Sequence, residues 1–501
     1  MEGLRAAIDE RLRNQPPFPE GRFAGRGIVI CAGGQRYFTC AWVLISLLRS
    51  VHQTKLPIQV WHLGRSEMSE AMQILLEEQG VEVVNAETVL HRYPARVAGP
   101  WPLKPYAIAH SRFREVLSLD ADTVPLADPG VILDWDLYRG SGLLFWPDII
   151  DLLETNPIWS HLGLEPRHCV SVESSVLAID KARAWDVLNV AILLNEHWRE
   201  SYKYLYGDKD TFLLAAILTG SRPAQIEHRP FSAGDDLVQR DVVGDPLFHH
   251  RTASKWKLLG ENRPLVVPAL AAACDKALAD LRRRWSGVIF HVPARSEQSR
   301  AEEAKLIELR RFRYITSSEA RWVELLRGGA IGEGRTQLEQ HWAVIGRGGD
   351  LVLQLYSGSR LAVELIAQPD GSWRGGSLGD SGFEARLIPD VVWGTWPSAD
   401  NRSAAAEIAA LLGPSLFASG FDPETGQDLQ AALSLLNRLF DDVPEQLTAK
   451  LAALTLCEAW RAALEPLAQS LKENRDARLD SISQDLVAPV AIDPRHYSRV
   501  F

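Results

Sequence analysis

The sequence predicts an α/β fold: a large domain built on a mostly parallel sheet, then a small antiparallel β module and a helical region. Two observations carry this prediction. Up to about residue 256, apolar runs of strand length alternate with helical patterns, which is typical of β-α-β units. Beyond that point, helical stretches come first, short strands punctuated by glycine follow, and an Ala- and Leu-rich stretch comes last. We therefore expect one large domain over residues 20–260.

The β-α-β start of the large domain is the clearest pattern. Gly27 to Cys31 is an apolar run that ends at Ala32-Gly33-Gly34, as expected for a buried parallel strand followed by a tight turn. Helical spacing follows, and Leu56-Pro57 precedes the next strand. The elements expected in order are a strand at 27–31, a helix at 38–50, a strand at 58–63, a helix at 66–79 and a strand at 81–84.

A fourth strand, residues 115–119, runs directly into Asp120-Ala121-Asp122. In open α/β sheets, ligands bind at the carboxyl ends of the strands. Both carboxylates therefore fall where a site is expected.

The second half of the chain predicts three further parts. Residues 261–330 are expected to be a helical extension, with its strongest patterns at 269–284 and 300–313 and with helical character up to 326. Residues 335–397 predict the antiparallel β module, residues 402–475 a helical C-terminal region, and residues 476–501 a tail. The strands expected within the module lie at 341–345, 351–356, 361–366, 372–375 and 383–388.

Composition excludes several classes of protein. The 501 residues carry a net charge of −10, which argues against a nucleic-acid binder, because phosphate binding needs a basic surface. No apolar run reaches the length of a membrane-spanning helix, and residues 1–19 lack the apolar core of a signal peptide. The five cysteines are scattered without metal-binding spacing. We expect a cytoplasmic protein with reduced thiols.

Asp120 and Asp122 are the first candidates for chemistry. Two carboxylates on alternate residues of one turn can reach the same hard cation, which in turn neutralises a diphosphate. The alternative is that the pair only caps a turn. Further along the chain, the adjacent His249 and His250 offer an imidazole as a third ligand, one of the two at most, and Lys255 is placed to contact a diphosphate.

Five other positions follow predicted strands or precede helices. Trp146 and Asp148 could shape an acceptor pocket, and Glu173 could face a reacting sugar carbon. Asp208 and Asp210 could accept hydrogen bonds from sugar hydroxyls. The structural alternatives are a turn at a strand end, a loop before an edge strand, and the cap of the helix expected at 212–218.

In this order and spacing, these segments resemble the fungal alpha-1,3-mannosyltransferase family, which are retaining glycosyltransferases of the GT-A fold. The resemblance spans roughly residues 26–257. It is carried by GIVICAGG (27–34), LPIQVWHLG (56–64), KPYAIAHSRFREVLSLDADTVPLADP (104–129), FWPDI (145–149), VESSVLAIDK (172–181), YGDKDTF (206–212) and VGDPLFHHRTASKW (243–256).

The resemblance implies a role for each candidate. Asp120 and Asp122 would hold Mn²⁺ or Mg²⁺, with His250 as the third ligand and His249 as the fallback. Glu173, Asp208 and Asp148 would be the catalytic carboxylates, of which Glu173 or Asp208 would stabilise the oxocarbenium-like transition state. The residues implied on the donor side are Ala32, Gly33, Lys104, Ser111, Asp120, Lys209 and Lys255, and those on the acceptor side are Trp146, Asp148 and Asp210.

Two differences from the fungal family bear on the substrate. The fungal enzymes have an N-terminal membrane helix, which this chain lacks, and the Ala/Arg/Leu-rich composition is typical of bacterial proteins. GDP-mannose is therefore the default donor, with a UDP-sugar as the rival, and the acceptor is a glycan, a protein or a small molecule. Residues 258–501 match no part of the fungal family, and the helical C-terminal region could pack on the large domain or form a homo-oligomer.

Two other functions stay open at this stage. A nucleotidyltransferase would need a longer glycine-rich loop than Gly33-Gly34-Gln35-Arg36 offers. A non-catalytic carbohydrate-binding protein would use aromatic side chains of the β module to stack on sugars, whereas the alternative is that these side chains form the module's own core. The aromatic residues concerned are Trp342, Tyr356, Trp373, Trp393 and Trp396.

Overall fold

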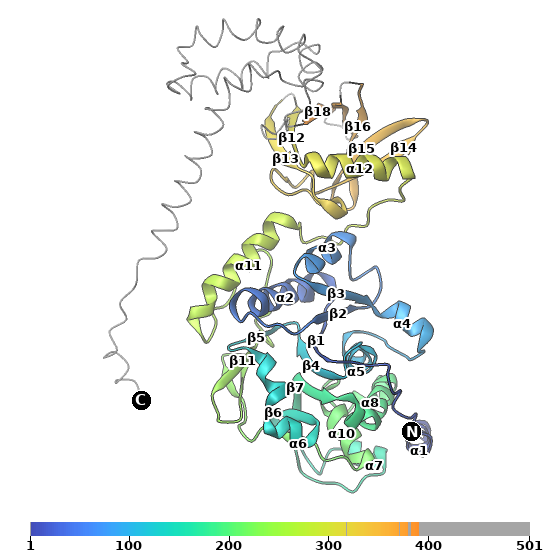
Figure 1. Ribbon diagram of the computed structural model, residues 1–501, viewed down its shortest axis with the longest axis vertical. Coiled ribbons are helices and arrows are strands. Elements are labelled where there is room, and N and C mark those ends of the chain that lie inside the picture. The colour runs from blue at the N-terminus through green and yellow to red at the C-terminus, as the bar shows by residue number, and fades with distance from the viewer. Residues whose placement is uncertain (1, 317, 370, 379–381, 390–501) are drawn as a thin grey trace, which may run out of the picture. The chain divides into compact units, whose positions relative to one another are not determined.

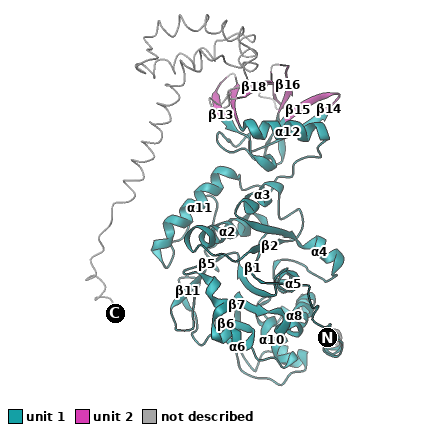
Figure 2. Ribbon diagram, in the orientation of Figure 1, with its two compact units in different colours: residues 1–310, 323–346, 354–363 teal, residues 311–322, 347–353, 364–501 magenta. Residues whose placement is uncertain are grey.

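The computed structural model describes residues 2–316, 318–369, 371–378 and 382–389. The chain divides into two compact units (Figure 2). The first comprises residues 1–310, 323–346 and 354–363, and the second comprises residues 311–322, 347–353 and those from 364 onward. All the residues predicted to form the site lie in the first unit.

The centre of the first unit is a seven-stranded mixed sheet (Figure 1). Its strand order is β3-β2-β1-β4-β7-β6-β8. The strands β1 to β4 are parallel neighbours, whereas β7 runs antiparallel to both β4 and β6. The strands are β1 (Arg26–Cys31), β2 (Ile58–His62), β3 (Val81–Asn85), β4 (Glu115–Asp120), β6 (Leu143–Leu152), β7 (Cys169–Asp180) and β8 (Ala224–Gln225).

Helices cover both faces of this sheet. Successive side chains of a strand point to opposite faces, and in these strands both sets of side chains are largely apolar. Ile28 and Ile30 of β1 pack with α2, α3 and α11, whereas Val29 packs with α5, α8 and α10. A π-helical turn, Leu47–Val51, continues α2. The helices of this unit are α1 (Glu2–Arg13), α2 (Gly34–Ser46), α3 (Glu70–Glu78), α4 (Ala86–Arg92), α5 (Pro100–His110), α6 (Asp136–Ser141), α7 (Ile158–Leu162), α8 (Lys181–Glu196), α9 (Trp198–Ser201), α10 (Lys209–Thr219), α11 (Ala271–Arg284) and α12 (Glu297–Leu309), with 3₁₀ turns at Pro129–Asp134, Pro268–Leu270 and Arg327–Gly329.

A second, four-stranded sheet begins immediately after the Asp-Ala-Asp turn. It has the order β5-β11-β10-β9, with β5 at Thr123–Pro125, β9 at Phe231–Ala233, β10 at Asp236–Arg240 and β11 at Pro246–His250. The antiparallel register places His250 opposite Thr123. This pairing brings a histidine from far along the chain next to Asp122.

The strands of the β module follow the prediction closely. They are β14 (His341–Arg347), β15 (Asp350–Ser357), β16 (Arg360–Ala367), β17 (Trp373–Ser377) and β18 (Glu384–Pro389), and the last two pair antiparallel.

The expectation of helix up to residue 326 is wrong at its end. Arg311–Thr316 forms β12 and Ala320–Glu324 forms β13. The reason is local: α12 ends where Arg310 takes a positive φ of 62°, and Phe312 and Tyr314 then alternate inward with the period of a strand.

Three of the five module aromatics form core, not a sugar-binding surface. Trp342, Tyr356 and Trp373 are buried. Trp393 and Trp396, the expected helical region at 402–475 and the tail at 476–501 lie outside the described residues.

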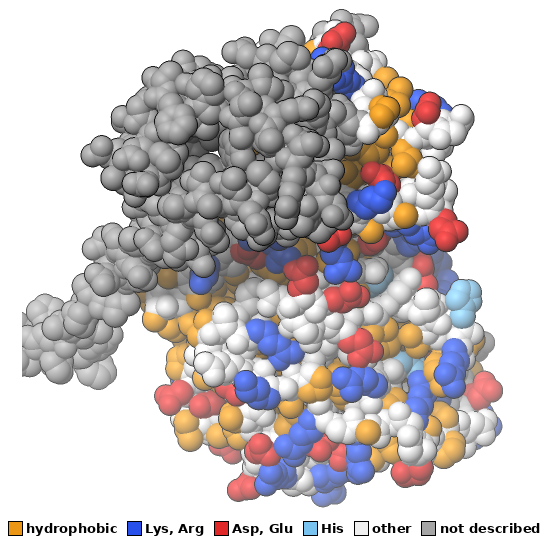
Figure 3. Space-filling view, turned by 45° about the horizontal axis from the view of Figure 1, so that its top comes forward, with side chains coloured by type: hydrophobic (Ala, Val, Ile, Leu, Met, Phe, Trp, Pro, Cys, Tyr) orange, Lys and Arg blue, Asp and Glu red, His pale blue; other side chains and the backbone are white. Residues whose placement is uncertain are grey.

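The predicted fold class, an α/β domain followed by an antiparallel β module, is confirmed among the described residues. Among the described helices, none combines the length and apolar character needed to cross a bilayer. Where Figure 3 draws described residues, acidic and basic side chains are interspersed on the surface.

Candidate active site

The site lies at the carboxyl end of β4. Asp120 is the last residue of that strand and is paired in register with Cys31, the last residue of β1. Ala32 and Gly33, which follow β1, therefore leave the sheet beside Asp120. Adjacent parallel strands ending at one edge create the crevice in which α/β proteins bind ligands.

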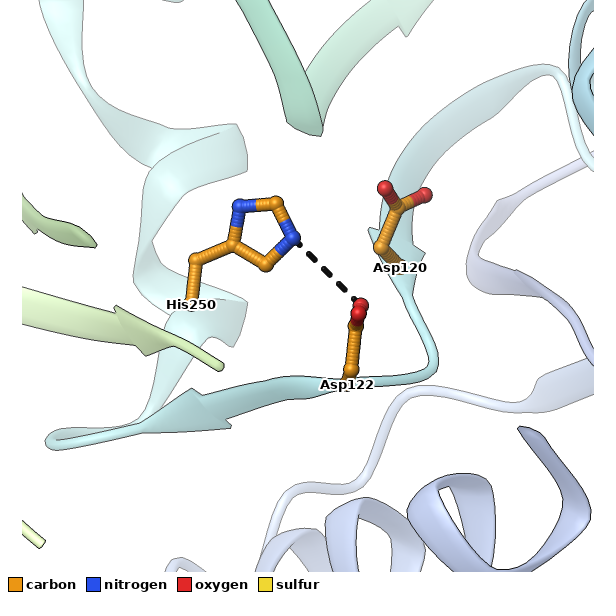
Figure 4. A group of neighbouring side chains, drawn as sticks. All are labelled: Asp120, Asp122 and His250. Carbon is orange, nitrogen blue, oxygen red and sulfur yellow. Dashed lines mark ion pairs between the residues drawn. The ribbon is translucent and has the colours of Figure 1, made fainter. Parts of the chain in front are cut away.

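Asp120, Asp122 and His250 converge on one point. Each offers one ligand atom, and these atoms all lie within 4.8 Å of one another. Figure 4 shows the imidazole of His250 directed toward both carboxylates, with its Nε2 3.4 Å from Oδ1 of Asp122. His249 points elsewhere and forms an ion pair with Asp236 at 3.2 Å, so the geometry favours His250 as the third ligand.

The charges around this point suit a divalent cation. Burial opposes the charge of His250, but the carboxylates of Asp122 and Glu173 raise the pKa of its imidazole to about 9. Burial also raises the pKa of Asp120 to about 6, with Lys104 acting in the opposite direction. A cation would displace the imidazole proton and take over its role between the carboxylates.

The donor set gives a second argument. Two carboxylates and one imidazole are ligands that divalent metal ions accept, because carboxylates suit hard cations and imidazole suits transition-metal ions. The Nδ1 atom of His250 is buried without a hydrogen bond, although Oε1 of Glu173 lies 3.5 Å away. Four carboxylates and two lysines meet here, leaving a net charge of −2 when the imidazole is neutral; they are Asp120, Asp122, Glu173, Asp208, Lys104 and Lys255.

Lys104 connects the metal group to a second carboxylate. It lies on α5, and its Nζ is 2.8 Å from Oδ1 of Asp120 and 3.0 Å from Oδ2 of Asp208. It also donates to the backbone and hydroxyl oxygens of Ser174. Burial disfavours its charge, but the two carboxylates raise the pKa of Lys104 above its ordinary value. The side chain is therefore a fixed cation between two acidic groups.

Lys255 and Tyr37 lie on the other side of Asp122. The Nζ of Lys255 is 2.6 Å from Oδ2 of Asp122 and 5.9 Å from the centre of the Tyr37 ring. Gly33 lies just before α2, where an added Cβ would meet the carboxylate of Glu67 at 2.4 Å. The turn after β1 therefore requires a residue without a side chain at this position.

Glu173 and Asp208 both point toward the site, and neither plays the structural role considered from the sequence. Glu173 lies within β7, not in a loop before an edge strand, and its Oε1 accepts from the backbone of Ser175 at 3.0 Å. Asp208 precedes α10, but its side chain makes no capping hydrogen bond to the helix. Its Oδ2 instead binds Lys104 and Ser174.

Asp148 and Lys209 form a buried ion pair next to this group. Asp210, by contrast, is committed to the fold. Its carboxylate accepts from the hydroxyl of Ser171 at 2.6 Å and from the backbone of Val172 at 3.0 Å, and so ties α10 to β7. Burial raises the pKa of Asp210.

Two predicted positions do not take the places expected of them. Trp146 pairs with Glu173 between β6 and β7, but its side chain is buried in the core and donates its indole N–H to the backbone of Arg240. Ser111 precedes the start of β4, and its carbonyl accepts from Lys181, next to the pair formed by Glu115 and Asp180. It therefore lies at the opposite end of β4 from Asp120.

Sequence reasoning overlooked Tyr37 and gave Ser174 no role of its own. Ser174 belongs to the motif that contains Glu173, but its hydrogen bonds to Lys104 and Asp208 join segments that are distant in sequence. Tyr37 lies in the first turn of α2, immediately after the glycine turn, where a helix start faces the crevice.

Comparison with known proteins finds similarity to mannosyltransferases in the N-terminal half of the chain. Residues 25–161 match the family described as "Mannosyltransferase putative". That match covers the Asp-Ala-Asp turn and Lys104. The chain is also similar to alpha-1,2-mannosyltransferase MNN2 of Saccharomyces cerevisiae, at 29% identity over 26% of this chain and 22% of the relative. Alpha-1,2-mannosyltransferase MNN22 of Candida albicans is 24% identical over 40% of this chain and 42% of its own.

The chain thus spans less than half the length of these relatives. Among solved structures, it is similar to the galactosyltransferase LgtC in complex with donor and acceptor sugar analogs, at 14% identity, with a TM-score of 0.33, over 55% of this chain and 99% of that one. The expected resemblance to fungal mannosyltransferases is confirmed at this coarse level. The expected alpha-1,3 linkage is not, because the fungal relatives are alpha-1,2-mannosyltransferases.

Proposed function

We propose that this protein is a metal-dependent, retaining glycosyltransferase that moves a hexose from a nucleotide sugar to a hydroxyl group of an acceptor. The observation that carries the proposal is the convergence of Asp120, Asp122 and His250 at the carboxyl end of β4. The similarity to mannosyltransferases over residues 25–161 supports mannose as the sugar, with GDP-mannose as the first donor to test.

In this proposal Asp120, Asp122 and His250 hold Mn²⁺ or Mg²⁺. When bound, the cation neutralises the diphosphate of the donor and stabilises the leaving nucleotide. Lys255 adds a positive charge on the same side, within reach of the donor phosphates. Ala32 and Gly33 leave room for the nucleoside beside β1, because neither projects a large side chain into the crevice.

Asp208 and Glu173 are the two carboxylates proposed to face the sugar. Lys104 and Ser174 both bond to Oδ2 of Asp208, which leaves Oδ1 to accept from a donor hydroxyl. Glu173 is held by Ser175, close to His250. Either carboxylate can stabilise positive charge that develops on the anomeric carbon. In a retaining front-face reaction, the leaving phosphate accepts the proton of the acceptor hydroxyl, so no further base is required.

The decisive experiment measures metal-dependent binding and hydrolysis of a panel of GDP- and UDP-sugars. We expect Asp120→Asn and Asp122→Asn to lower turnover by about 10²–10³-fold and to abolish the part of nucleotide binding that Mn²⁺ adds. Asp136→Asn is the matched control, since Asp136 is an exposed carboxylate on α6 and should keep wild-type activity.

Two outcomes would contradict the proposal. Full activity of Asp122→Asn in the presence of a chelator would remove the metal role. Failure of the wild-type protein to bind or hydrolyse any nucleotide sugar of the panel would remove the glycosyltransferase assignment. The panel also decides between GDP-mannose and a UDP-sugar.

A further inference from the structure

Two aromatic side chains stand exposed next to the Lys104–Asp208 ion pair. Among the described residues, Trp101 and Tyr206 are the only aromatic side chains with a large exposed fraction, 47% and 76%. Exposure of large aromatic rings costs free energy in water, so a pair of exposed rings calls for an explanation.

Both rings are attached directly to the site. Trp101 lies on α5, one helical turn before Lys104, and Tyr206 lies two residues before Asp208. Because Lys104 and Asp208 are ion-paired at 3.0 Å, the segments carrying the two rings are held together at this point. The ring centroids are 6.2 Å apart, with an interplanar angle of 48°.

Neighbouring residues fix the orientation of the two rings. Gly207 adopts a positive φ of 73°, and an added Cβ would come within 3.0 Å of the Trp101 ring, so glycine lets the indole pack directly on the backbone. Tyr202 packs edge-on against Trp101, with centroids 5.7 Å apart. The Nζ of Lys209 lies 5.3 Å from the centre of the Tyr206 ring. The aromatic pair thus packs against Gly207, Tyr202 and Lys209 on one side and is exposed to solvent on the other.

The chemistry of this surface fits a sugar ring. A pyranose has an apolar face of C–H groups that packs against an aromatic face, and hydroxyl groups around its rim that need polar partners. Trp101 and Tyr206 supply the aromatic faces, and the ion pairs Lys209–Asp148 and Lys104–Asp208 lie beside them.

We propose that Trp101 and Tyr206 form an acceptor subsite that stacks a pyranose ring, so that the acceptor is a saccharide. This inference rests on the proposed glycosyltransferase function and specifies which class of acceptor the site takes. Trp101 and Tyr206 act as binding residues outside the metal group, and Gly207 is the positioning residue that permits their packing.

The test uses the full-length protein and four variants: Trp101→Ala, Trp101→Phe, Tyr206→Ala and Tyr206→Phe. Acceptor binding is measured by saturation-transfer NMR with methyl α-mannopyranoside and an α-mannobiose, which requires no donor. Transfer kinetics and donor hydrolysis without acceptor are measured in parallel. The matched control is Leu259→Ala, which shortens another exposed apolar side chain (69%) outside the pair.

We expect Trp101→Ala and Tyr206→Ala to weaken saccharide binding and raise the acceptor KM by about tenfold, with donor hydrolysis within about twofold of wild type. Each Phe variant keeps a ring and should lose less than its Ala counterpart. Thermal midpoints equal to wild type establish that the variants fold.

An unchanged acceptor KM in both Ala variants would overturn the subsite, and so would an equal loss of donor hydrolysis and acceptor binding. Transfer to a peptide or lipid acceptor, but to no saccharide, would overturn it as well. These outcomes are distinct from failure of the proposed function, which appears as absence of nucleotide-sugar binding in the wild-type protein.

Discussion

At the scale of single residues, the site is held by buried charges that neutralise one another. Lys104 is the clearest case, since it is buried and its Nζ contacts two carboxylates. Taking a charge out of water costs several kcal/mol, and only a close partner of opposite sign offsets that cost. Lys104 therefore offsets the electrostatic repulsion between the carboxylates of Asp120 and Asp208.

Replacement of Lys104 by methionine tests this balance. Lys104→Met should lower the free energy of unfolding by about 3–5 kcal/mol, because the buried carboxylate of Asp208 and the partly buried carboxylate of Asp120 lose their partner. Adding Asp208→Asn should recover part of the loss, because one of the orphaned charges is removed. Chemical denaturation of the two single variants and the double variant measures the coupling. If the losses in the two single variants simply add in the double variant, the ion pair contributes nothing to the free energy of unfolding.

His341 predicts an acid sensitivity unrelated to the site. It is buried, its Nδ1 donates to the carbonyl of Gly358 at 2.9 Å, and its Nε2 accepts from the hydroxyl of Ser286 at 2.8 Å. Burial lowers the pKa of His341 to about 4, below the ordinary value of 6.5. The pKa of His341 is lower in the folded state than in the unfolded state. The free energy of unfolding is therefore at its full value above about pH 6.5 and decreases as the pH falls toward 4.

The expected loss is roughly 2 kcal/mol between pH 7 and pH 4.5. His341→Asn cannot titrate, so its free energy of unfolding should fall less over the same interval, even if it is lower at pH 7. Denaturant titrations at both pH values measure the difference. His91→Asn, at an exposed position, is the control and should behave as wild type. The same acid dependence in His341→Asn and wild type would contradict the assignment.

At the scale of elements, helix α5 runs from the site at the carboxyl end of β4 to the opposite end of that strand. Its first half carries Trp101 and Lys104 at the site, and its last turn is anchored at the other end by Lys181. The Nζ of Lys181 donates to the carbonyls of Ala109 and Ser111 at 3.2 and 2.7 Å. These are carbonyls at the end of the helix, which have no helical partner of their own.

Lys181→Met should therefore free the end of α5 and lower the free energy of unfolding by about 2–3 kcal/mol, since two buried carbonyls lose their donor. Lys203→Met, at an exposed lysine, should change it by less than about 0.5 kcal/mol. Hydrogen exchange provides the local readout, with faster exchange expected at the last turn of α5. If the two variants are equally stable, Lys181 does not cap this helix.

Elements with a clear pattern of apolar residues could be predicted from the sequence, whereas elements defined by strand pairing could not. β1 was predictable because its apolar run, residues 27–31, ends at a glycine turn, and β2 because β-branched and aromatic residues follow Leu56-Pro57. β12 was not, because Arg311 and Arg313 continue the charged helical pattern, and only the inward burial of Phe312 and Tyr314 identifies a strand. Ser111 illustrates the same limit: proximity in sequence to β4 does not indicate which end of the strand a side chain occupies.

At the scale of the whole molecule, the site is assembled from segments that are distant in sequence. Asp120 ends β4 and Asp122 follows it, Asp208 precedes α10, and His250 ends β11. Two contacts bring these segments together. The pairing of β5 with β11 sets His250 opposite Thr123, and Lys104 forms an ion pair with Asp208. Neither contact is encoded by a local pattern.

The sequence by itself determined the α/β class, the position of Asp120 and Asp122 at a strand end, and the candidate residues around them. Alternation of apolar residues and the placement of turn residues are local properties, so a sequence displays them directly. Only the tertiary structure favoured His250 over His249 as a ligand, placed Ser111 at the far end of β4, buried the side chain of Trp146, and exposed Trp101 and Tyr206 beside the site. Those outcomes depend on strand register and on packing between distant segments, which fix the direction of each side chain only once the chain is folded.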